Sequence, residues 1–572
     1  MSAPAPIPRR EGLLVAVLTL CWLAFTGWVR PLALPDEGRY VGVAWEGLRQ
    51  GDGWVPTLNG LPFFHKPPLF YWITEASMAL FGANAWAARA APLVGAMLAA
   101  LGLFALLRRW ASPSLARAAL LTLLAMPLFF TGAQFANLDM LVAGLITATI
   151  AAAADAALRV EHGLPHRATL AGAFALAGLG VLAKGLIGIV LPGAVLVLWL
   201  ASRGRWRTLR ALLWLPGIVL MLAVAAPWFI AMQLRYPGFL HYFFVVQHLQ
   251  RFAGGGFNNV QPIWFFPAVL AVATLPAAPW LAKGWRAVTW RPAPGLDGRN
   301  EQNQQNQQNQ QNEQDQQNEQ DQQNELHRLN GPNGLNEQNE LHRQNGQNEL
   351  NELNGLNGLM LCWFVVILVF FSIPASKLVG YILPALPPLA GLIALAWERV
   401  VDVAPRWRRW GAVSLGTGAA VGLGAVVAVG AGVGGDKSNR ELARDLAARR
   451  QPGEPVVMLE SYLYDLPFHA RLEAPVLVVE DWDDPTLMGR DSWRKELGDA
   501  RLFVGDEAAL RRFQRWSTIE PALCAQPVSW VVGDADLAKA HPWLARAERI
   551  AARRHLALWR VRAADLACGG PR

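Results

Sequence analysis

Acidic, basic and aromatic side chains gather in one segment near the N-terminus. Residues 34–72 read LPDEGRYVGVAWEGLRQGDGWVPTLNGLPFFHKPPLFYW, and the polar residues of interest there are Asp36, Glu37, Arg39, Tyr40, His65 and Lys66. Carboxylates next to Arg and Lys suit a reaction that binds a phosphate and positions or deprotonates a second group. The alternative is an inert, solvated helix end at the membrane surface, and for Asp36 alone both interpretations stay open.

Further polar residues lie within or beside apolar runs: Asp139 in FANLDM, Lys184 in LAKGLIG, Arg251 after HYFFVVQH, and Lys377 and Tyr381 in SKLVGYILP. An unpaired ammonium at membrane depth is costly, so we expect Lys184 to face a polar cavity. The guanidinium fork of Arg251 matches phosphate oxygens. Asp139 could instead be a hydrogen-bonded structural carboxylate, Lys184 could snorkel, and Arg251 could contact a lipid headgroup. Lys377 and Tyr381 could be ordinary interface anchors.

Membrane-spanning helices must position these residues. Hydrophobic residues make up 53% of the 572 residues and charged residues 16%, and the apolar residues fall into runs of about 17 to 25, the length that crosses a bilayer. We predict an α-helical polytopic membrane protein with about 11 to 13 transmembrane helices. The candidate spans lie near residues 12–29, 87–107, 114–132, 139–157, 169–183, 186–201, 211–231, 263–281, 359–374, 380–397 and 411–433.

The basic residues predict how these spans are oriented. The net charge of +8 comes from Lys and Arg between the apolar runs, where such residues set topology, so we expect no nucleic-acid partner. If the spans alternate, the basic clusters fall on one face, which the positive-inside rule makes cytoplasmic. We therefore predict that the polar segments face the side opposite the cytoplasm, which in a bacterial inner membrane is the periplasm. The clusters are Arg9/Arg10, Arg108/Arg109, Arg203/Arg205/Arg207/Arg210, Lys283/Arg286 and Arg406/Arg408/Arg409.

Composition divides the chain into a transmembrane domain, residues 1–435, and a soluble periplasmic α/β domain, residues 436–572. Within the first, residues 30–86 form the first periplasmic loop. Residues 300–359, a run of Asn- and Gln-rich triplets, form a cytoplasmic insertion that we expect to be disordered. The soluble domain has strand-like runs at 455–459, 475–479, 501–504, 528–532 and 556–561 and a helix-like stretch at 506–516.

The four cysteines show no metal-type spacing. Cys21 and Cys362 lie within or beside apolar runs, and only Cys524 and Cys568 could form a disulfide in an oxidising compartment. No Gly-rich phosphate loop and no Ser-His-Asp arrangement is visible.

The order of several motifs resembles the bacterial aminoarabinose lipid A transferases and related membrane glycosyltransferases of the protein O-mannosyltransferase type. The motifs are DEGRY, GDGWVPTLNGLPFFHKPPLFYW, FANLDM, LAKGLIG, HYFFVVQHLQRF and SKLVGYILPALPPL, and the match runs from about residue 12 to 400. The resemblance implies a GT-C fold, a place in the bacterial inner membrane with the active site facing the periplasm, a polyprenyl-phosphate sugar donor and an acceptor associated with the membrane. The absence of a nucleotide motif fits a donor carried on a lipid.

The resemblance also implies roles for individual residues. Asp36 corresponds to the acidic residue of the first external loop that these enzymes place at the reaction centre, and Asp139 matches a second acidic position of the fold, so these two are the expected catalytic residues. Lys66 corresponds to the lysine of a KPP element. Glu37 and His65 are the candidates for a metal or acceptor contact, although His65 departs from the glutamate more usual at its position. A divalent cation is the one cofactor candidate. The residues expected to bind the donor phosphate and the substrates are Arg39, Tyr40, Lys66, Lys184, Arg251, Lys377 and Tyr381.

The predicted reaction moves a sugar, 4-amino-4-deoxy-L-arabinose by resemblance, from a polyprenyl-phosphate donor to lipid A or a related periplasmic acceptor. The first alternative is a hexosyl or mannosyl transferase of the same fold that modifies protein or polysaccharide. The second is a transporter of lipid-linked sugars, but transporters usually show internal repeats and broken helices near the membrane midplane.

Overall fold

The computed structural model describes residues 6–250, 259–284, 355–484, 486, 492–566 and 568. Arg251 and most of the predicted insertion lie outside these residues. The last residues of that insertion, 355–359, instead begin the helix Gly355–Ser372. Leu356 and Leu359 in this first turn are buried, and their packing explains why the helix starts before the predicted boundary.

Seven helices in the described part of the chain are long and apolar enough to cross a membrane, and two bent helix pairs raise this number to nine. The chain is thus a multi-span membrane protein. The long helices include α4 (Ala90–Trp110), α7 (Leu138–Glu161), α8 (Arg167–Lys184), α11 (Leu215–Arg235), Gly355–Ser372, α18 (Leu386–Val403) and α19 (Arg408–Asp436). The bent pairs are α5 (Pro113–Ala125) with α6 (Pro127–Ala133), and α13 (Phe265–Ala273) with α14 (Ala278–Gly284).

Each of the predicted spans contains a helix or a bent pair. Two of these helices, α1 (Arg9–Ala24) and α9 (Ile187–Ser202), have 16 residues each. This is shorter than the roughly 20 residues that cross a bilayer without tilt. The 70° bend between α5 and α6 occurs at Met126, whose backbone is extended. Met126 precedes Pro127, and proline disfavours helical backbone at the residue before it.

Helix α7 lies at the centre of the bundle, where it is almost completely buried. It packs closely against α4 because two glycines face each other. A Cβ on Gly95 would lie 2.2 Å from the carbonyl oxygen of Met140, and a Cβ on Gly144 would lie 2.0 Å from that of Gly95. Small residues of this kind let two membrane helices approach backbone to backbone. This packing places Asp139, in the first turn of α7, inside the protein.

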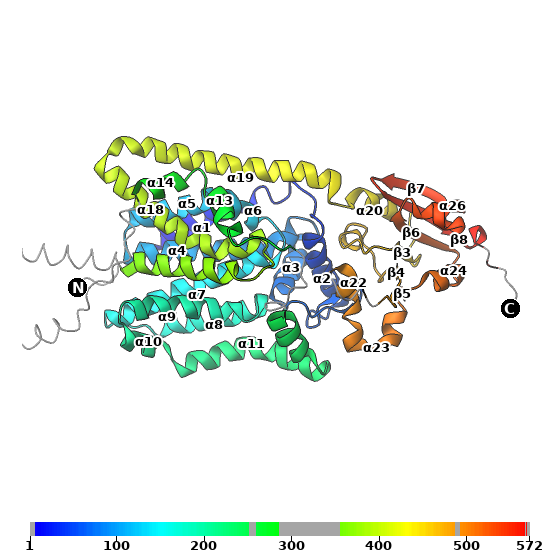
Figure 1. Cartoon of the computed structure of the whole chain (residues 1–572), viewed down its shortest axis with the longest axis horizontal. Helices are drawn as coiled ribbons and strands as arrows, with labels where there is room; N and C mark the ends of the chain where they lie inside the picture. The colour runs from blue at the N-terminus through cyan, green and yellow to red at the C-terminus, as the bar shows by residue number, and fades with distance from the viewer. Residues whose placement is uncertain are drawn as a thin grey trace, which may run out of the picture.

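The first external loop folds into α2 (Asp36–Gln50), the short strands β1 (Thr57–Leu58) and β2 (Leu61–Pro62), and α3 (Leu69–Phe81). Helix α2 is amphipathic, and its buried face includes Glu37, Tyr40, Val41 and Ala44. Figure 1 shows α2 and α3 between the helical bundle and the C-terminal sheet. The polar motifs of this loop therefore lie where the two parts of the protein meet.

The C-terminal part forms one six-stranded sheet with the order β5-β4-β3-β6-β8-β7. The pairs among β5, β4, β3 and β6 are parallel, and β8 and β7 are antiparallel to their neighbours. The strands are β3 (Val456–Leu459), β4 (Leu477–Val479), β5 (Phe513–Gln514), β6 (Val528–Asp534), β7 (Glu548–Arg553) and β8 (Leu556–Arg562).

Four of the five predicted strands are present, but the run at 501–504 is part of a helix, α23 (Arg501–Leu510). Short apolar runs do not distinguish strand from helix by their pattern. In the helix, Phe503 packs edge-on against Phe64 and Tyr236. This contact with other segments decides the conformation.

Cys524 and Cys568, the two cysteines that the sequence left able to pair, form a disulfide. It ties the end of α24 (Trp516–Cys524) to the C-terminal end of the chain.

Candidate active site

A cavity of about 240 Å³ lies at the junction of the bundle, the first loop and the C-terminal domain. It is lined from all three regions. Of the residues predicted from the sequence, the structure brings together Asp36, Arg39, Tyr40, His65, Lys66, Asp139, Lys184 and Tyr381 around this cavity. Phe370, Phe371 and Ile187, which belong to membrane helices, add apolar walls.

Asp36 begins α2, and Arg39 follows one turn later on the same face, where the two form an ion pair. Burial raises the pKa of the Asp36 carboxyl; Arg39 lowers it, and the charges of Asp139 and Glu496 raise it again. A carboxylate with a raised pKa is a better general base near neutral pH than an ordinary surface aspartate. Asp36 therefore lines the cavity and has the raised pKa that suits a proton acceptor.

Asp139 and Lys184 form an ion pair across the cavity, at the start of α7 and the end of α8. The side chain of Asn137 caps α7 by accepting a hydrogen bond from the Asp139 backbone N–H at 3.1 Å. The Lys184 ammonium also lies 4.5 Å from the centre of the Tyr381 ring. Lys184 therefore faces a polar cavity, as predicted, instead of the lipid.

Gly380, in the 3-10 helix η4 (Val379–Ala385), lies directly against Asp139. A Cβ at Gly380 would be 2.2 Å from Asp139 Oδ2. No side chain other than hydrogen fits there without moving the carboxylate. The SKLVGYILP motif thus contributes a glycine as well as Tyr381 to the site.

Glu496 enters the cavity from the C-terminal domain and was not predicted from the sequence. It lies on α22 (Trp493–Gly498), accepts a hydrogen bond from the Tyr464 hydroxyl, and forms an ion pair with Arg39. Both residues follow strands of the parallel sheet, β3 in the case of Tyr464 and β4 in the case of Glu496. The loops at the carboxyl ends of parallel strands are a common place for ligand-binding residues. That rule is the signal that could have identified them.

His65 belongs to a buried hydrogen-bonded cluster beside the cavity. Its Nε2 lies 3.0 Å from the Tyr242 hydroxyl and 3.5 Å from Asp499 Oδ2, and its ring stacks on Phe63. Tyr242 donates to Asp499 Oδ2 at 2.7 Å, and Gln247 donates to the Tyr242 oxygen at 2.9 Å. We call His65, Tyr242, Gln247 and Asp499 the His65 cluster.

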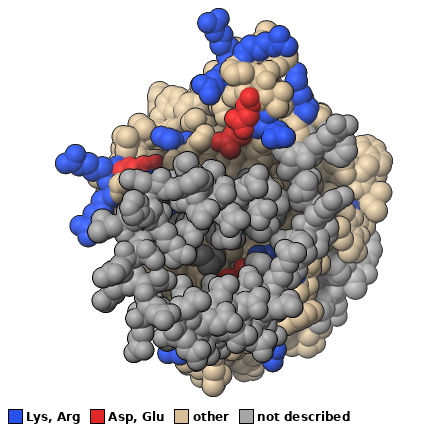
Figure 2. All heavy atoms as spheres, turned by 90° about the vertical axis from the view of Figure 1, so that its left-hand side faces the viewer, with Lys and Arg blue, Asp and Glu red and all other residues tan. Residues whose placement is uncertain are grey.

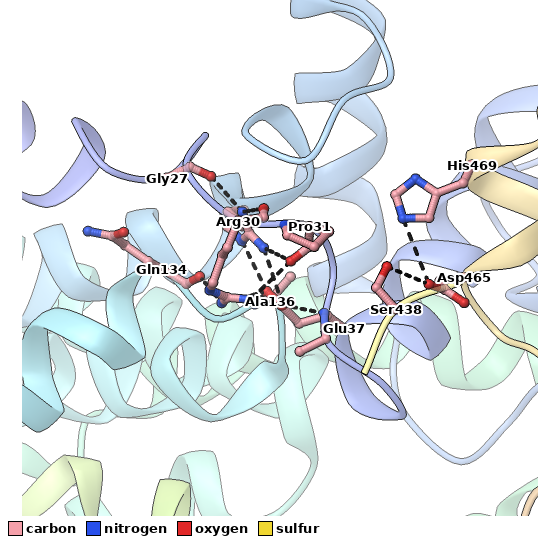
Figure 3. A network of polar contacts seen from close by, with 11 residues as sticks. Gly27, Arg30, Pro31, Glu37, Gln134, Ala136, Ser438, Asp465 and His469 are labelled. Atoms are coloured by element: carbon pink, nitrogen blue, oxygen red, sulfur yellow. Dashed lines mark hydrogen bonds and ion pairs between the residues drawn. The ribbon is translucent and has the colours of Figure 1, made fainter. Parts of the chain in front are cut away.

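Glu37 does not line the cavity, which corrects its prediction as a metal or acceptor contact. The side chain is completely buried and forms an ion pair with Arg30 (Figure 3). It forms a second ion pair with Arg89. It also accepts hydrogen bonds from the backbone N–H groups of Ala33 and Ala136, both at 2.8 Å. Burial alone would raise the pKa of Glu37, but Arg89 and Arg30 lower it to about 2. Its oxygens are fully engaged in fixing the start of α2.

Lys377 is also outside the cavity. It is buried, and its ammonium donates to the backbone carbonyl of Gln261 at 2.9 Å. Its backbone N–H donates to the carbonyl of Asn259 at 3.1 Å. The predicted binding residue therefore holds two segments of the chain together.

Among the described residues, no three His, Cys, Asp or Glu side chains are grouped so that they could hold a metal ion.

A second polar cluster, also shown in Figure 3, joins the end of α19 to the C-terminal domain. The buried carboxylate of Asp465 accepts hydrogen bonds from the Ser438 hydroxyl at 3.1 Å and the Asn439 N–H at 2.8 Å, and His469 lies 3.8 Å away. Gly38 of α2 packs against Asp465, because a Cβ at Gly38 would lie 3.0 Å from the backbone nitrogen of Asp465. The cluster thus connects the end of α19 and the first turn of α2 to the C-terminal domain.

The chain is similar to several known proteins. Residues 65–230 match the family described as dolichyl-phosphate-mannose-protein mannosyltransferase. An undecaprenyl phosphate-α-4-amino-4-deoxy-L-arabinose arabinosyl transferase of Sodalis glossinidius is 31% identical over 68% of this chain and 59% of its own length. One from Serratia proteamaculans is 33% identical over 46% of this chain and 48% of its own length. The chain thus spans about half to three fifths of these relatives.

The fold matches the crystal structure of ArnT from Cupriavidus metallidurans bound to undecaprenyl phosphate, with a TM-score of 0.72 over 98% of this chain and 99% of that one at 23% sequence identity. The apo state of the same protein matches with a TM-score of 0.70. The resemblance seen in the motifs and the predicted fold class, membrane helices followed by a small α/β domain, are both confirmed.

Proposed function

The chain is related in sequence and fold to the aminoarabinose-transferase-like membrane glycosyltransferases of the GT-C type, and we propose that it is a polyprenyl-phosphate-sugar-dependent glycosyltransferase. The sugar proposed is 4-amino-4-deoxy-L-arabinose, and the acceptor is lipid A or a related membrane-associated molecule. The relatives that support this choice are named as transferases of that sugar from undecaprenyl phosphate.

One observation carries the proposal: the cavity contains both acidic and basic groups beside apolar walls. Arg39, Lys66 and Lys184 line it together with Asp36, Asp139 and Glu496. Cleavage of the bond between sugar and phosphate leaves negative charge on the phosphate, and prearranged cations stabilise that charge. Apolar walls from membrane helices suit a donor whose lipid chain lies along the bundle.

Each carboxylate has a distinct place in this mechanism. Asp36, with its raised pKa, deprotonates an acceptor hydroxyl, or orients the acceptor when the nucleophile is a phosphate that is already anionic. Asp139 holds Lys184 in the cavity through their ion pair. Glu496 supplies a carboxylate from the C-terminal domain that can pair with the ammonium of an amino sugar. The simplest course is a single displacement of the phosphate by the acceptor, with inversion of configuration at the sugar carbon that is transferred.

We place the active site on the periplasmic side of the bacterial inner membrane. Helix α10 (Trp206–Leu212) and the turn between α18 and α19 lie at the end of the bundle opposite the C-terminal sheet (Figure 1). Lys and Arg side chains gather around the rim of that far end (Figure 2), as the positive-inside rule expects for a cytoplasmic face. The Cys524–Cys568 disulfide fits the oxidising periplasm.

A hexosyl transferase of the same fold is the second candidate. The family that matches residues 65–230 is described as a mannosyltransferase that acts on protein. This description favours a hexosyl transferase. A hexose lacks the ammonium that Glu496 would bind, so the two candidates differ in how they should respond to a change at Glu496.

A divalent cation remains a prediction, which metal analysis of the purified protein and the effect of a chelator on transfer would test.

Mass spectrometry of lipid A tests the proposal directly. Cells that supply polyprenyl-phosphate aminoarabinose and express the protein should show a mass increment equal to the sugar, and Asp36→Asn should abolish it. Asp52→Asn is the matched control, because Asp52 lies in the same loop but on the surface, where it pairs with Arg235. Unmodified lipid A from cells with folded protein would reject the aminoarabinose assignment and direct the search to hexose donors.

A further inference from the structure

The His65 cluster connects three segments that each carry part of the proposed site. His65 precedes Lys66 in the first loop. Tyr242 and Gln247 lie in η2 (His241–Gln250), a π-helix. Asp499 directly follows α22, three residues after Glu496, and residues spaced by three share one face of a helix. All four members of the cluster are buried.

The hydrogen bonds assign the protons within the cluster. A tyrosine hydroxyl has one proton and two lone pairs. Tyr242 gives its proton to Asp499, and its oxygen accepts from the Gln247 amide. The remaining contact, to His65 Nε2 at 3.0 Å, therefore requires that Nε2 carries a proton and donates. In this arrangement His65 Nε2 has no lone pair to offer a metal ion.

Asp499 completes the cluster as its anionic member. Its second oxygen accepts from Lys495 at 3.2 Å. Burial would raise the pKa of Asp499, but His65, Tyr242 and Lys495 lower it below its ordinary value. A buried carboxylate of this kind needs all its partners, because an unpaired charge at such a place is strongly unfavourable. The Tyr242 hydroxyl contacts each of the other three members.

We propose that Tyr242 is a positioning residue, whose hydroxyl holds α22 against the first loop and thereby sets the positions of Lys66, which faces the donor phosphate, and Glu496, which faces the sugar. The consequence for donor binding rests on the proposed function. The contact between α22 and the first loop does not. The proposal predicts that loss of the hydroxyl weakens donor binding and leaves the chemical step largely intact. In kinetic terms KM for the donor rises, while kcat changes little.

Tyr242→Phe removes only the hydroxyl. Tyr236→Phe is the matched control, since Tyr236 packs on the neighbouring Phe64 and Phe503 and takes no part in the His65 cluster. Two measurements are made on the full-length protein in lipid nanodiscs: amide hydrogen exchange over residues 493–498 and 61–72, and binding of undecaprenyl phosphate. Asp499→Asn, which keeps the shape but removes the charge, is the second variant.

We expect Tyr242→Phe to raise exchange in both segments and to weaken undecaprenyl phosphate binding about five-fold, the effect of one hydrogen bond of ordinary strength. Tyr236→Phe should change neither. Unchanged exchange in Tyr242→Phe and Asp499→Asn would overturn the proposal, and so would raised exchange with unchanged affinity. If exchange rises but the wild-type protein binds no undecaprenyl phosphate, the contact between α22 and the first loop stands and the proposed donor fails.

Discussion

Arg39 in the first loop and Glu496 in the C-terminal domain form an ion pair across 457 positions of sequence. Arg39 also pairs with Asp36, so one guanidinium joins the proposed catalytic carboxylate to the domain that follows the last membrane helix. Both Arg39 and Glu496 line the cavity. The C-terminal domain is thus part of the site's wall.

Glu496→Gln should reduce transfer about 30-fold, because the cavity loses a carboxylate and Arg39 loses one of its two charged partners; a hydrogen bond to a charged group contributes about 2 kcal/mol. The measurement is the initial rate of sugar transfer by the purified protein. Glu441→Gln, an exposed position in the same domain, is the control and should retain the wild-type rate. Equal rates for both variants would remove Glu496 from the site.

Gly380→Ala should lower transfer about 100-fold, the scale expected when a reacting group is displaced by about 1 Å. The added methyl group must push Asp139 out of position, since the two would otherwise be 2.2 Å apart. Gly172→Ala, on α8 with open space around it, should be active. Thermal unfolding in detergent must show that Gly380→Ala is folded, and full activity in that variant would contradict the packing described for η4.

Glu37→Gln should destabilise the protein by about 3 to 5 kcal/mol, the range for breaking a buried ion pair from one side. The change leaves Arg30 and Arg89 buried without their shared carboxylate. Its neighbour Asp36 is not part of that network, so Asp36→Asn should unfold close to the wild-type temperature. A large fall in transition temperature for Asp36→Asn and none for Glu37→Gln would reverse the roles assigned here.

Stability should depend on pH through Glu46. Burial raises the pKa of Glu46 to about 7, even though hydrogen bonds from Gly60, Thr57 and Asn59 lower it. The pKa of an unfolded glutamate is about 4.3, so its stabilising contribution is fully present below that value and is lost as pH rises through 7, by at most about 1.4 kcal/mol per pH unit.

Glu46→Gln should therefore flatten the fall in unfolding temperature between pH 5.5 and pH 8. Glu548→Gln is the control, because Glu548 is exposed and pairs with Arg562 at the surface. It should keep the wild-type pH profile. A wild-type profile in Glu46→Gln would assign the pH dependence to another group.

Much of the membrane domain could be predicted because its signals are local. Length and polarity alone identify a membrane helix, and each predicted span contains one. Most of the predicted polar residues also line one cavity. Asp36, Asp139 and Lys184 lie at helix ends, and in the membrane such ends are the places where charged groups can be accommodated.

The sequence by itself did not separate Asp36 from Glu37. The two are adjacent and chemically alike, yet α2 turns one into the cavity and the other toward Arg30 and Arg89. Lys377 was misassigned for the same reason, because its partner is a backbone carbonyl more than a hundred residues away. Whether a charged side chain faces substrate or structure depends on how a helix is rotated against its neighbours.

The amino-acid sequence thus determined the class of protein, the places of its helices and the segments that carry the chemistry, since hydropathy and motif order are properties of short stretches of chain. Tertiary structure alone decided that Glu496 and Tyr242 join these segments and that residues 501–504 are helical. These outcomes depend on contacts between segments hundreds of residues apart, and the free energy of such contacts is not encoded in any local pattern.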